Sequence, residues 1–309
     1  IAAFGHISAK AAAAKIEHGV VGRLLDRVDL EGLGKHKTTF PFNQAGARKS
    51  GTKRSNNFDY FEGVGDVPGD NAQMDTKPKM AKSVDGKVGF AVVVDSATGY
   101  CTIYVFGSKT DAWVVIGKHG RSAEEFGHIL RYFRADDGTE IRSEKCKAEA
   151  RRLMASFEVA DTASPNEIGM AEKRIGMILD MARALLDHAC IPWVFWSFAV
   201  IAANDIINKV VQKGESESPY TKWRRGAVPI VHEARIFGER YMIKGERTAS
   251  GDPLAEAVVG YYMGMSVVKK NSKVLFVPDG AEKWKIVVTE RANKKMDEVV
   301  LVPRTPTPP

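Results

Sequence analysis

The stretch GFAVVVDSATGYCTIYVF, residues 89–106, decides the fold class. It contains two runs of β-branched and aromatic residues, which favour strands. Between the runs lies Ser96-Ala-Thr-Gly99, whose residues favour turns, so the stretch predicts a β-hairpin. A third, weaker strand is expected just before the hairpin, over residues 72–75.

Downstream of the hairpin, helical and strand patterns alternate. The expected elements are a helical stretch within 111–128, a strand at 129–134, a charged helix at 143–156, a strand at 157–160, and long helices at 165–187 and 192–211. Strands followed by alternating helices and strands predict an α/β fold, with a mixed sheet covered by helices on both faces. Such sheets bind ligands beyond the carboxyl ends of their strands.

The two ends of the chain differ from this central part. Residues 8–25 have helical spacing, and residues 303–309 are too rich in proline to pack. Five short β runs with glycine breaks predict a small C-terminal β-barrel; they lie at 234–244, 257–265, 273–277, 284–289 and 298–302. The expected division is a helical module (1–45), a linker (46–71), the α/β core (72–213), a β-rich domain (214–302) and a proline-rich tail (303–309).

The composition indicates a soluble intracellular protein with an acidic partner. The 309 residues carry a formal net charge of +7, which permits a nucleic acid partner without requiring one. The three cysteines, Cys101, Cys146 and Cys190, are far apart in the sequence, so neither a disulfide framework nor a cysteine-rich metal site is expected. No apolar run approaches the roughly 18 residues that a membrane span requires, so no membrane contact is expected.

Three acidic residues are candidates for a metal site. Asp136 follows a predicted strand and precedes a glycine turn, and Glu172 lies beside the apolar stripe of the first long helix. The 35 residues between them allow a helix, a strand and a turn to bring that helix back to the end of the strand. Asp75, which closes the first predicted strand, would supply a third carboxylate. Taken singly, Asp136 also suits a turn and Glu172 a solvated helix face.

Three carboxylates at one sheet edge suit divalent cations that prefer oxygen ligands, namely Mg²⁺ or Mn²⁺. Two such ions, roughly 4 Å apart, can activate an attacking oxygen and stabilise a leaving oxygen in phosphoryl transfer.

The order of short motifs resembles the integrase of copia-type long-terminal-repeat retrotransposons, in the retroviral-integrase-like superfamily. The matching segments, in order, are Met74-Asp-Thr-Lys-Pro-Lys-Met80, Val92-Val-Val-Asp95, Arg134-Ala-Asp-Asp-Gly-Thr-Glu-Ile141, Ser164 to Glu172, Met181-Ala-Arg-Ala-Leu-Leu186 with Ile191-Pro-Trp-Val-Phe-Trp196, Ser218-Pro-Tyr-Thr-Lys-Trp223 and Arg235-Ile-Phe-Gly238. The resemblance extends from about residue 72 to residue 302.

This resemblance implies a ribonuclease H-like fold and a polynucleotidyl transferase from a Pol polyprotein. Asp75, Asp136 and Glu172 would be the catalytic residues and would hold two Mg²⁺ or Mn²⁺ ions. The enzyme would process the 3′ ends of element DNA and join them to target DNA, as a homo-multimer in the nucleus or in a cytoplasmic particle before nuclear entry. Basic residues expected to contact DNA phosphates are Lys173, Arg174, Arg224, Arg225, Lys269 and Lys270; ordinary solvated surface charge is the alternative for each.

The sequence also departs from the family. The N-terminal module keeps His6, but Ile1, Val28 and Glu31 stand where the other three zinc ligands are expected, so no zinc site is predicted. Two alternatives to an active integrase therefore stay open. One is a metal-dependent nuclease on the same scaffold, and the other is a catalytically inactive remnant that binds DNA or multimerises.

Overall fold

The structure is a computed structural model that describes residues 67–135, 143–159, 169–229, 235–243, 258–265, 273–279, 283–289 and 292–294. The chain divides into two compact units, Ile1–Phe237 and Gly238–Pro309. The N-terminal helical module with its missing zinc ligands, Asp136, Lys269, Lys270 and the proline-rich tail lie outside the described residues.

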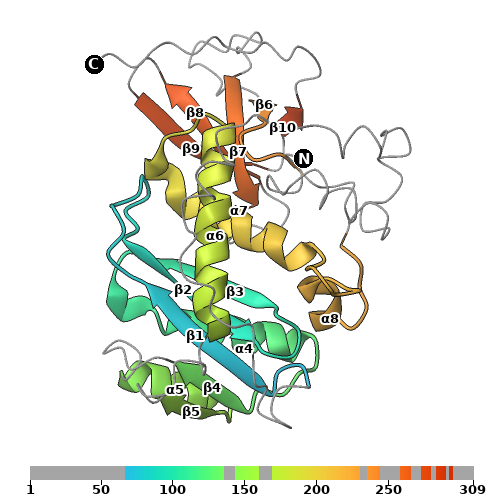
Figure 1. Ribbon diagram of the computed structural model, residues 1–309. Coiled ribbons are helices and arrows are strands. Elements are labelled where there is room, and N and C mark those ends of the chain that lie inside the picture. Colours follow the sequence, from blue (N-terminus) through green and yellow to red (C-terminus); the bar gives the residue numbers. More distant parts are fainter. Residues whose placement is uncertain are drawn as a thin grey trace, which may run out of the picture. The chain divides into compact units, whose positions relative to one another are not determined.

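The first unit is built on a five-stranded mixed sheet (Figure 1). Its strands are β1 (Asn71–Lys77), β2 (Gly89–Asp95), β3 (Cys101–Phe106), β4 (Tyr132–Ala135) and β5 (Ser156–Val159). Their spatial order is β3-β2-β1-β4-β5. The first three strands pair antiparallel, whereas β4 pairs parallel with both β1 and β5. The predicted mixed sheet is confirmed, and β1 is its central strand.

The turn of the predicted hairpin is held by a buried carboxylate at the end of β2. Asp95 accepts hydrogen bonds from the backbone N–H of Gly69 at 2.8 Å and from the N–H and hydroxyl of Thr98 at 2.8 and 2.6 Å. Burial raises the pKa of Asp95, and these hydrogen bonds oppose the shift. Gly99 completes the turn with a φ of 69°, a backbone conformation that glycine adopts without strain.

Helices cover both faces of the sheet, as predicted. They are α4 (Val114–Glu125), α5 (Glu144–Arg152), α6 (Gly169–His188), α7 (Trp196–Lys209) and the short α8 (Pro219–Trp223), with 3₁₀ turns at Lys109–Asp111 and Trp193–Phe195. The apolar side chains of α4 and α5 share a core with Ala72 and Met74 of β1. Because successive strand residues point to opposite faces, Gln73 and Asp75 face the other layer, where α6 packs on β1.

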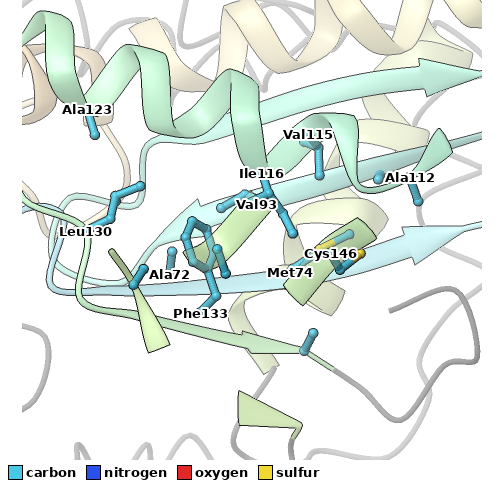
Figure 2. Close-up of a cluster of buried hydrophobic side chains, with 14 of the residues drawn as sticks. Ala72, Met74, Val93, Ala112, Val115, Ile116, Ala123, Leu130, Phe133 and Cys146 are labelled. Atoms are coloured by element: carbon cyan, nitrogen blue, oxygen red, sulfur yellow. The ribbon is translucent and has the colours of Figure 1, made fainter. Parts of the chain in front are cut away.

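The core between the sheet and α4 fixes the backbone of β1. Figure 2 shows Met74, Val93, Ile116 and Phe133 converging there, and all four are fully buried. Burying a side chain of this size contributes roughly 1.5–3 kcal/mol. The strand that carries Asp75 is therefore a rigid part of the fold.

Trp223 of α8 belongs to the same core, although it falls within the range predicted for the C-terminal domain. Its indole ring is fully buried, stacks on Tyr100 at 5.0 Å, and donates a hydrogen bond from Nε1 to the Ser122 hydroxyl at 2.9 Å. Ser218 caps α8 by accepting a hydrogen bond from the backbone N–H of Thr221 at 3.1 Å. The segment after α7 thus completes the first unit, while the other predicted domain limits stay predictions.

The second unit contains a five-stranded antiparallel sheet. Its strands are β6 (Arg240–Ile243), β7 (Val258–Met265), β8 (Lys273–Asp279), β9 (Lys283–Thr289) and β10 (Ala292–Lys294), in the spatial order β10-β6-β7-β8-β9. The first four correspond to four of the predicted β runs. The fifth predicted run, at 298–302, lies outside the described residues, and β10 was not predicted. No helix among the described residues has the length and apolar character needed to cross a membrane.

Candidate metal and DNA site

Asp75 lies in the middle of the central strand. Asp75 is half-buried and pairs with Val92 of β2. One carboxylate oxygen, Oδ1, accepts a hydrogen bond from the backbone N–H of Thr76 at 2.6 Å. Asp75 and Gln73 are two residues apart on one strand, so both side chains are on the α6 side of the sheet.

The first turn of α6 is bound directly to β1. The backbone N–H of Met170 donates a hydrogen bond to the side-chain oxygen of Gln73 at 3.0 Å, across 97 residues of sequence. Glu172 follows two residues after Met170 and is exposed. The start of the helix that carries Glu172 is therefore attached to the strand that carries Asp75. The alternation of polar and apolar residues in β1, NAQMDTK, is the sequence signal that could have placed Gln73 on the same face as Asp75.

The third candidate, Asp136, lies outside the described residues. Ala135, which precedes it, ends β4 and pairs in parallel with Met74, which precedes Asp75. Among the residues that the structure describes, no three His, Cys, Asp or Glu side chains are grouped so that they could hold a metal ion. The assignment of Asp75, Asp136 and Glu172 as the catalytic triad stays a prediction.

Arg174, which the sequence predicts to contact DNA phosphates, is buried. This residue is only 6% exposed, and its guanidinium donates a hydrogen bond to the carbonyl of Gly99 in the β2–β3 turn. Burial lowers its pKa. A side chain held in this way is not available to DNA phosphates. Lys173, its neighbour on α6, is exposed, and its contact with DNA stays a prediction.

Two further arginines predicted to contact DNA attach α8 to the loop after α4. Arg224 is half-buried, with its guanidinium 4.5 Å from the ring centres of both Phe126 and Tyr220. Arg225 is exposed, and one of its terminal nitrogens donates a hydrogen bond to the carbonyl of Gly127 at 2.6 Å. Arg224 therefore has a packing role, and Arg225 is the better placed of the two to reach a ligand.

Two histidines that had no predicted role lie against Trp223. The His119 ring is fully buried, 5.0 Å from the Trp223 ring, and its Nδ1 is 3.0 Å from the Thr102 hydroxyl. Burial, together with the nearby His128, lowers the pKa of His119 to about 3. His128 Nε2 lies 2.6 Å from the carbonyl oxygen of Trp223. This cluster joins α4, β3 and α8 and serves the stability of the fold.

Comparison with known proteins identifies the relationship of this chain. No family model matches it. It is 26% identical over 190 residues to the retrovirus-related Pol polyprotein from transposon TNT 1-94 of Nicotiana tabacum. The chain is a distant relative of a retrotransposon Pol polyprotein. This relationship confirms the resemblance predicted from the motif order. The match covers 60% of this chain but only 14% of that polyprotein, so the chain corresponds to a small part of its relative.

Solved structures with low sequence identity also match this Pol-related chain. The intasome of simian T-cell lymphotropic virus in complex with the PP2A regulatory subunit B56 gamma contains a chain that is 14% identical, covering 74% of this chain and 80% of that one, with a TM-score of 0.43. The magnesium-bound catalytic core domain of HTLV-2 integrase, in its trimeric form, is 17% identical, with coverages of 50% and 96% and a TM-score of 0.39. The catalytic core domain of BIV integrase is 16% identical, with coverages of 51% and 95% and a TM-score of 0.40.

Proposed function

We propose that this chain is a DNA integrase that processes the 3′ ends of element DNA and joins them to target DNA by metal-dependent phosphoryl transfer. The observation that carries the proposal is the hydrogen bond from Met170 to Gln73. It attaches the turn that carries Glu172 to the strand that carries Asp75, in a chain related to a retrotransposon polyprotein. Two acidic residues 97 positions apart in the sequence thereby belong to one region of the fold.

The third ligand is assigned to Asp136 by the connectivity of the chain. Ala135 and Met74 are paired on two parallel strands, and Asp136 and Asp75 directly follow them in the sequence. Carboxylates in this arrangement suit Mg²⁺ or Mn²⁺, because these ions prefer oxygen ligands. The half-buried Asp75 fits such a group, since a carboxylate held by the sheet needs little reorganisation on binding a cation.

The proposed reaction has two steps. In 3′ processing, a water oxygen attacks a phosphorus near the DNA end and the water gives up a proton, while the bond from that phosphorus to the 3′ oxygen breaks and this oxygen takes up a proton. In joining, the freed 3′-hydroxyl oxygen attacks a phosphorus of the target strand, and the target's 3′ oxygen leaves and takes up a proton. When bound, two cations would stabilise the attacking and the leaving oxygen. The three carboxylates hold these cations, and the rigid strand β1 orients one of the carboxylates.

The second unit is proposed to form a small barrel that adds DNA contacts. Strands β9 and β10 occupy opposite edges of the sheet, yet three Cα–Cα steps join Thr289 to Ala292, a span of at most about 11 Å. In a flat sheet those edges would be about 19 Å apart. The sheet must therefore curl strongly, which supports closure. Lys269 and Lys270 of this unit, with Lys173 and Arg225, are the proposed phosphate contacts.

Assembly and location complete the proposal. The chain acts as a homo-multimer, because joining both ends of one element to a target requires two active sites. Its site of action is the nucleus, where the target DNA lies.

The test is the joining of a labelled DNA end to a plasmid, with and without Mg²⁺. We expect Mg²⁺-dependent joining by the parent chain and none by Asp75→Asn, Asp136→Asn or Glu172→Gln. Asp180→Asn is the matched control, because Asp180 is an exposed residue of α6 that pairs with Arg183 at the surface. Retained joining by Asp136→Asn would reject the assigned triad. Cleavage without joining would identify a nuclease, and Mg²⁺-independent DNA binding without cleavage would identify an inactive DNA-binding remnant.

A further inference from the structure

Gln73 is a buried amide in the central strand of the sheet. It is 8% exposed and lies between Ala72 and Met74, which are fully buried in the core on the other face. Burying an amide without hydrogen bonds is unfavourable, so such groups nearly always have a partner. The partner of the side-chain oxygen is the backbone N–H of Met170.

This hydrogen bond provides an acceptor for one N–H group of the first turn of α6. The first four N–H groups of an α-helix have no acceptor within the helix. Usually a Ser, Thr, Asp or Asn just before the helix accepts one of them. For α6, one such acceptor comes from β1, so this hydrogen bond attaches the first turn of the helix to the sheet.

The bond lies between the elements that carry two of the proposed metal ligands. Asp75 is two residues after Gln73 on the same face of β1, and Glu172 is two residues after Met170 in α6. We infer that Gln73 is a positioning residue that holds the first turn of α6, and with it Glu172, against the strand of Asp75. The inference rests on the proposed metal site and adds a residue that is not itself a ligand.

Other contacts hold α6 beyond its first turn, so loss of the bond to Gln73 should affect the first turn alone. The guanidinium of Arg174 is attached to the Gly99 carbonyl, and Ile175 and Ile178 are buried in the next turns. These contacts keep most of α6 in place when the bond to Gln73 is removed. The turn before Arg174 is the part that loses its attachment.

The test compares Gln73→Met with Gln73→Glu. Methionine has a similar length but no oxygen to accept the bond, whereas glutamate keeps an acceptor, and its negative charge is favourable at a helix N-terminus. Gln212→Met is the matched control, since Gln212 hydrogen-bonds to Ile207 and Val210 at the end of α7. Hydrogen exchange of the first-turn amides of α6, measured on the full chain, reports whether the turn stays attached.

We expect these amides to exchange about fivefold faster in Gln73→Met, because loss of an acceptor for a first-turn N–H costs about 1 kcal/mol. Gln73→Glu and Gln212→Met should exchange like the parent. Binding of Mn²⁺, followed by electron paramagnetic resonance, should weaken by up to about fivefold in Gln73→Met, with little change in its melting temperature.

The two measurements separate this inference from the proposed function. Unchanged exchange in Gln73→Met would overturn the inference even if the parent binds Mn²⁺. Faster exchange with unaltered Mn²⁺ affinity would overturn the positioning role and leave Gln73 as a structural cap. A parent chain that does not bind Mn²⁺ would reject the proposed metal site, and the positioning role with it, whatever the exchange rates.

Discussion

Acidification should destabilise the first unit through His119. This side chain is fully buried against Trp223 and Phe133, with ring centres 5.0 and 6.3 Å away. Its pKa falls from the usual 6.5 to about 3 in the folded chain, first because burial disfavours the imidazolium and second because of His128. A group with a lowered folded pKa contributes stability that is complete above its unfolded pKa and is lost as the pH falls towards its folded pKa.

The size of the effect follows from the difference between the two pKa values. One pKa unit corresponds to about 1.4 kcal/mol, so the full difference amounts to about 5 kcal/mol. Above pH 6.5 this contribution to stability is nearly constant. Between pH 7 and pH 4 the loss therefore occurs almost entirely from pH 6.5 down to pH 4, and it amounts to about 3 kcal/mol. That loss is a large share of the 5–15 kcal/mol that is typical of a folded domain.

Urea unfolding followed by circular dichroism at pH 7 and pH 4 measures this loss. The informative comparison is with His119→Asn, which keeps a polar group near the Thr102 hydroxyl but cannot take up a proton. The parent should lose about 3 kcal/mol more than the variant between the two pH values. Parallel pH profiles for the two proteins would refute the reasoning, because they would mean that His119 either stays neutral when unfolded or is solvated when folded.

Two matched pairs of substitutions test the packing. Trp223→Ala should lower the free energy of unfolding of the first unit by about 3–5 kcal/mol in urea titrations. Trp193→Ala, at a residue that is 37% exposed, should lower it by less than about 1 kcal/mol. Equal losses in the two variants would contradict the burial of α8 in the core. Gly89→Ala should cost about 1–3 kcal/mol in melting experiments, because a Cβ there would lie 2.6 Å from both the Lys77 carbonyl oxygen and the Phe106 ring. At Gly176 an added Cβ would have no neighbour within 4 Å, so Gly176→Ala should instead stabilise α6 by up to about 1 kcal/mol. A stabilising effect of Gly89→Ala would contradict the register of β1, β2 and β3.

The parts of the fold that follow from local periodicity could be predicted. The hairpin over residues 89–106 and the alternation of helices and strands depend on patterns within a few residues of each other, and the structure confirms the sheet that they imply. The position of Trp223 could not be predicted in this way. It depends on contacts with Ser122 of α4 and with Tyr100, both more than 100 residues away in the sequence. A helix of five residues also carries no periodic signal.

For Arg174, the helical period and the charge of the side chain predict opposite degrees of burial. It lies three residues after Ala171 and four before Ile178, both fully buried, so the helical period places it on the buried stripe of α6. The charge of arginine favours exposure, and the predicted contact with DNA phosphates depended on it. The structure follows the period, because the Gly99 carbonyl gives the guanidinium a partner inside the fold.

The candidate site was only partly predictable for a physical reason. Spacing indicated that Asp75, Asp136 and Glu172 could meet, but spacing contains no information about which groups hold α6 against β1. The alternation along β1 places Gln73 on the face of Asp75, but it does not reveal that the partner of the Gln73 amide is Met170, 97 residues away.

Calorimetric titration of the chain with Mg²⁺ tests the central claim most directly, because it requires no DNA substrate. The parent should bind the ion, and Asp75→Asn, Asp136→Asn and Glu172→Gln should each lose most of that binding, while Asp180→Asn should bind like the parent. Binding that survives in Asp136→Asn, or that falls equally in Asp180→Asn, would show that the three carboxylates do not hold the metal together.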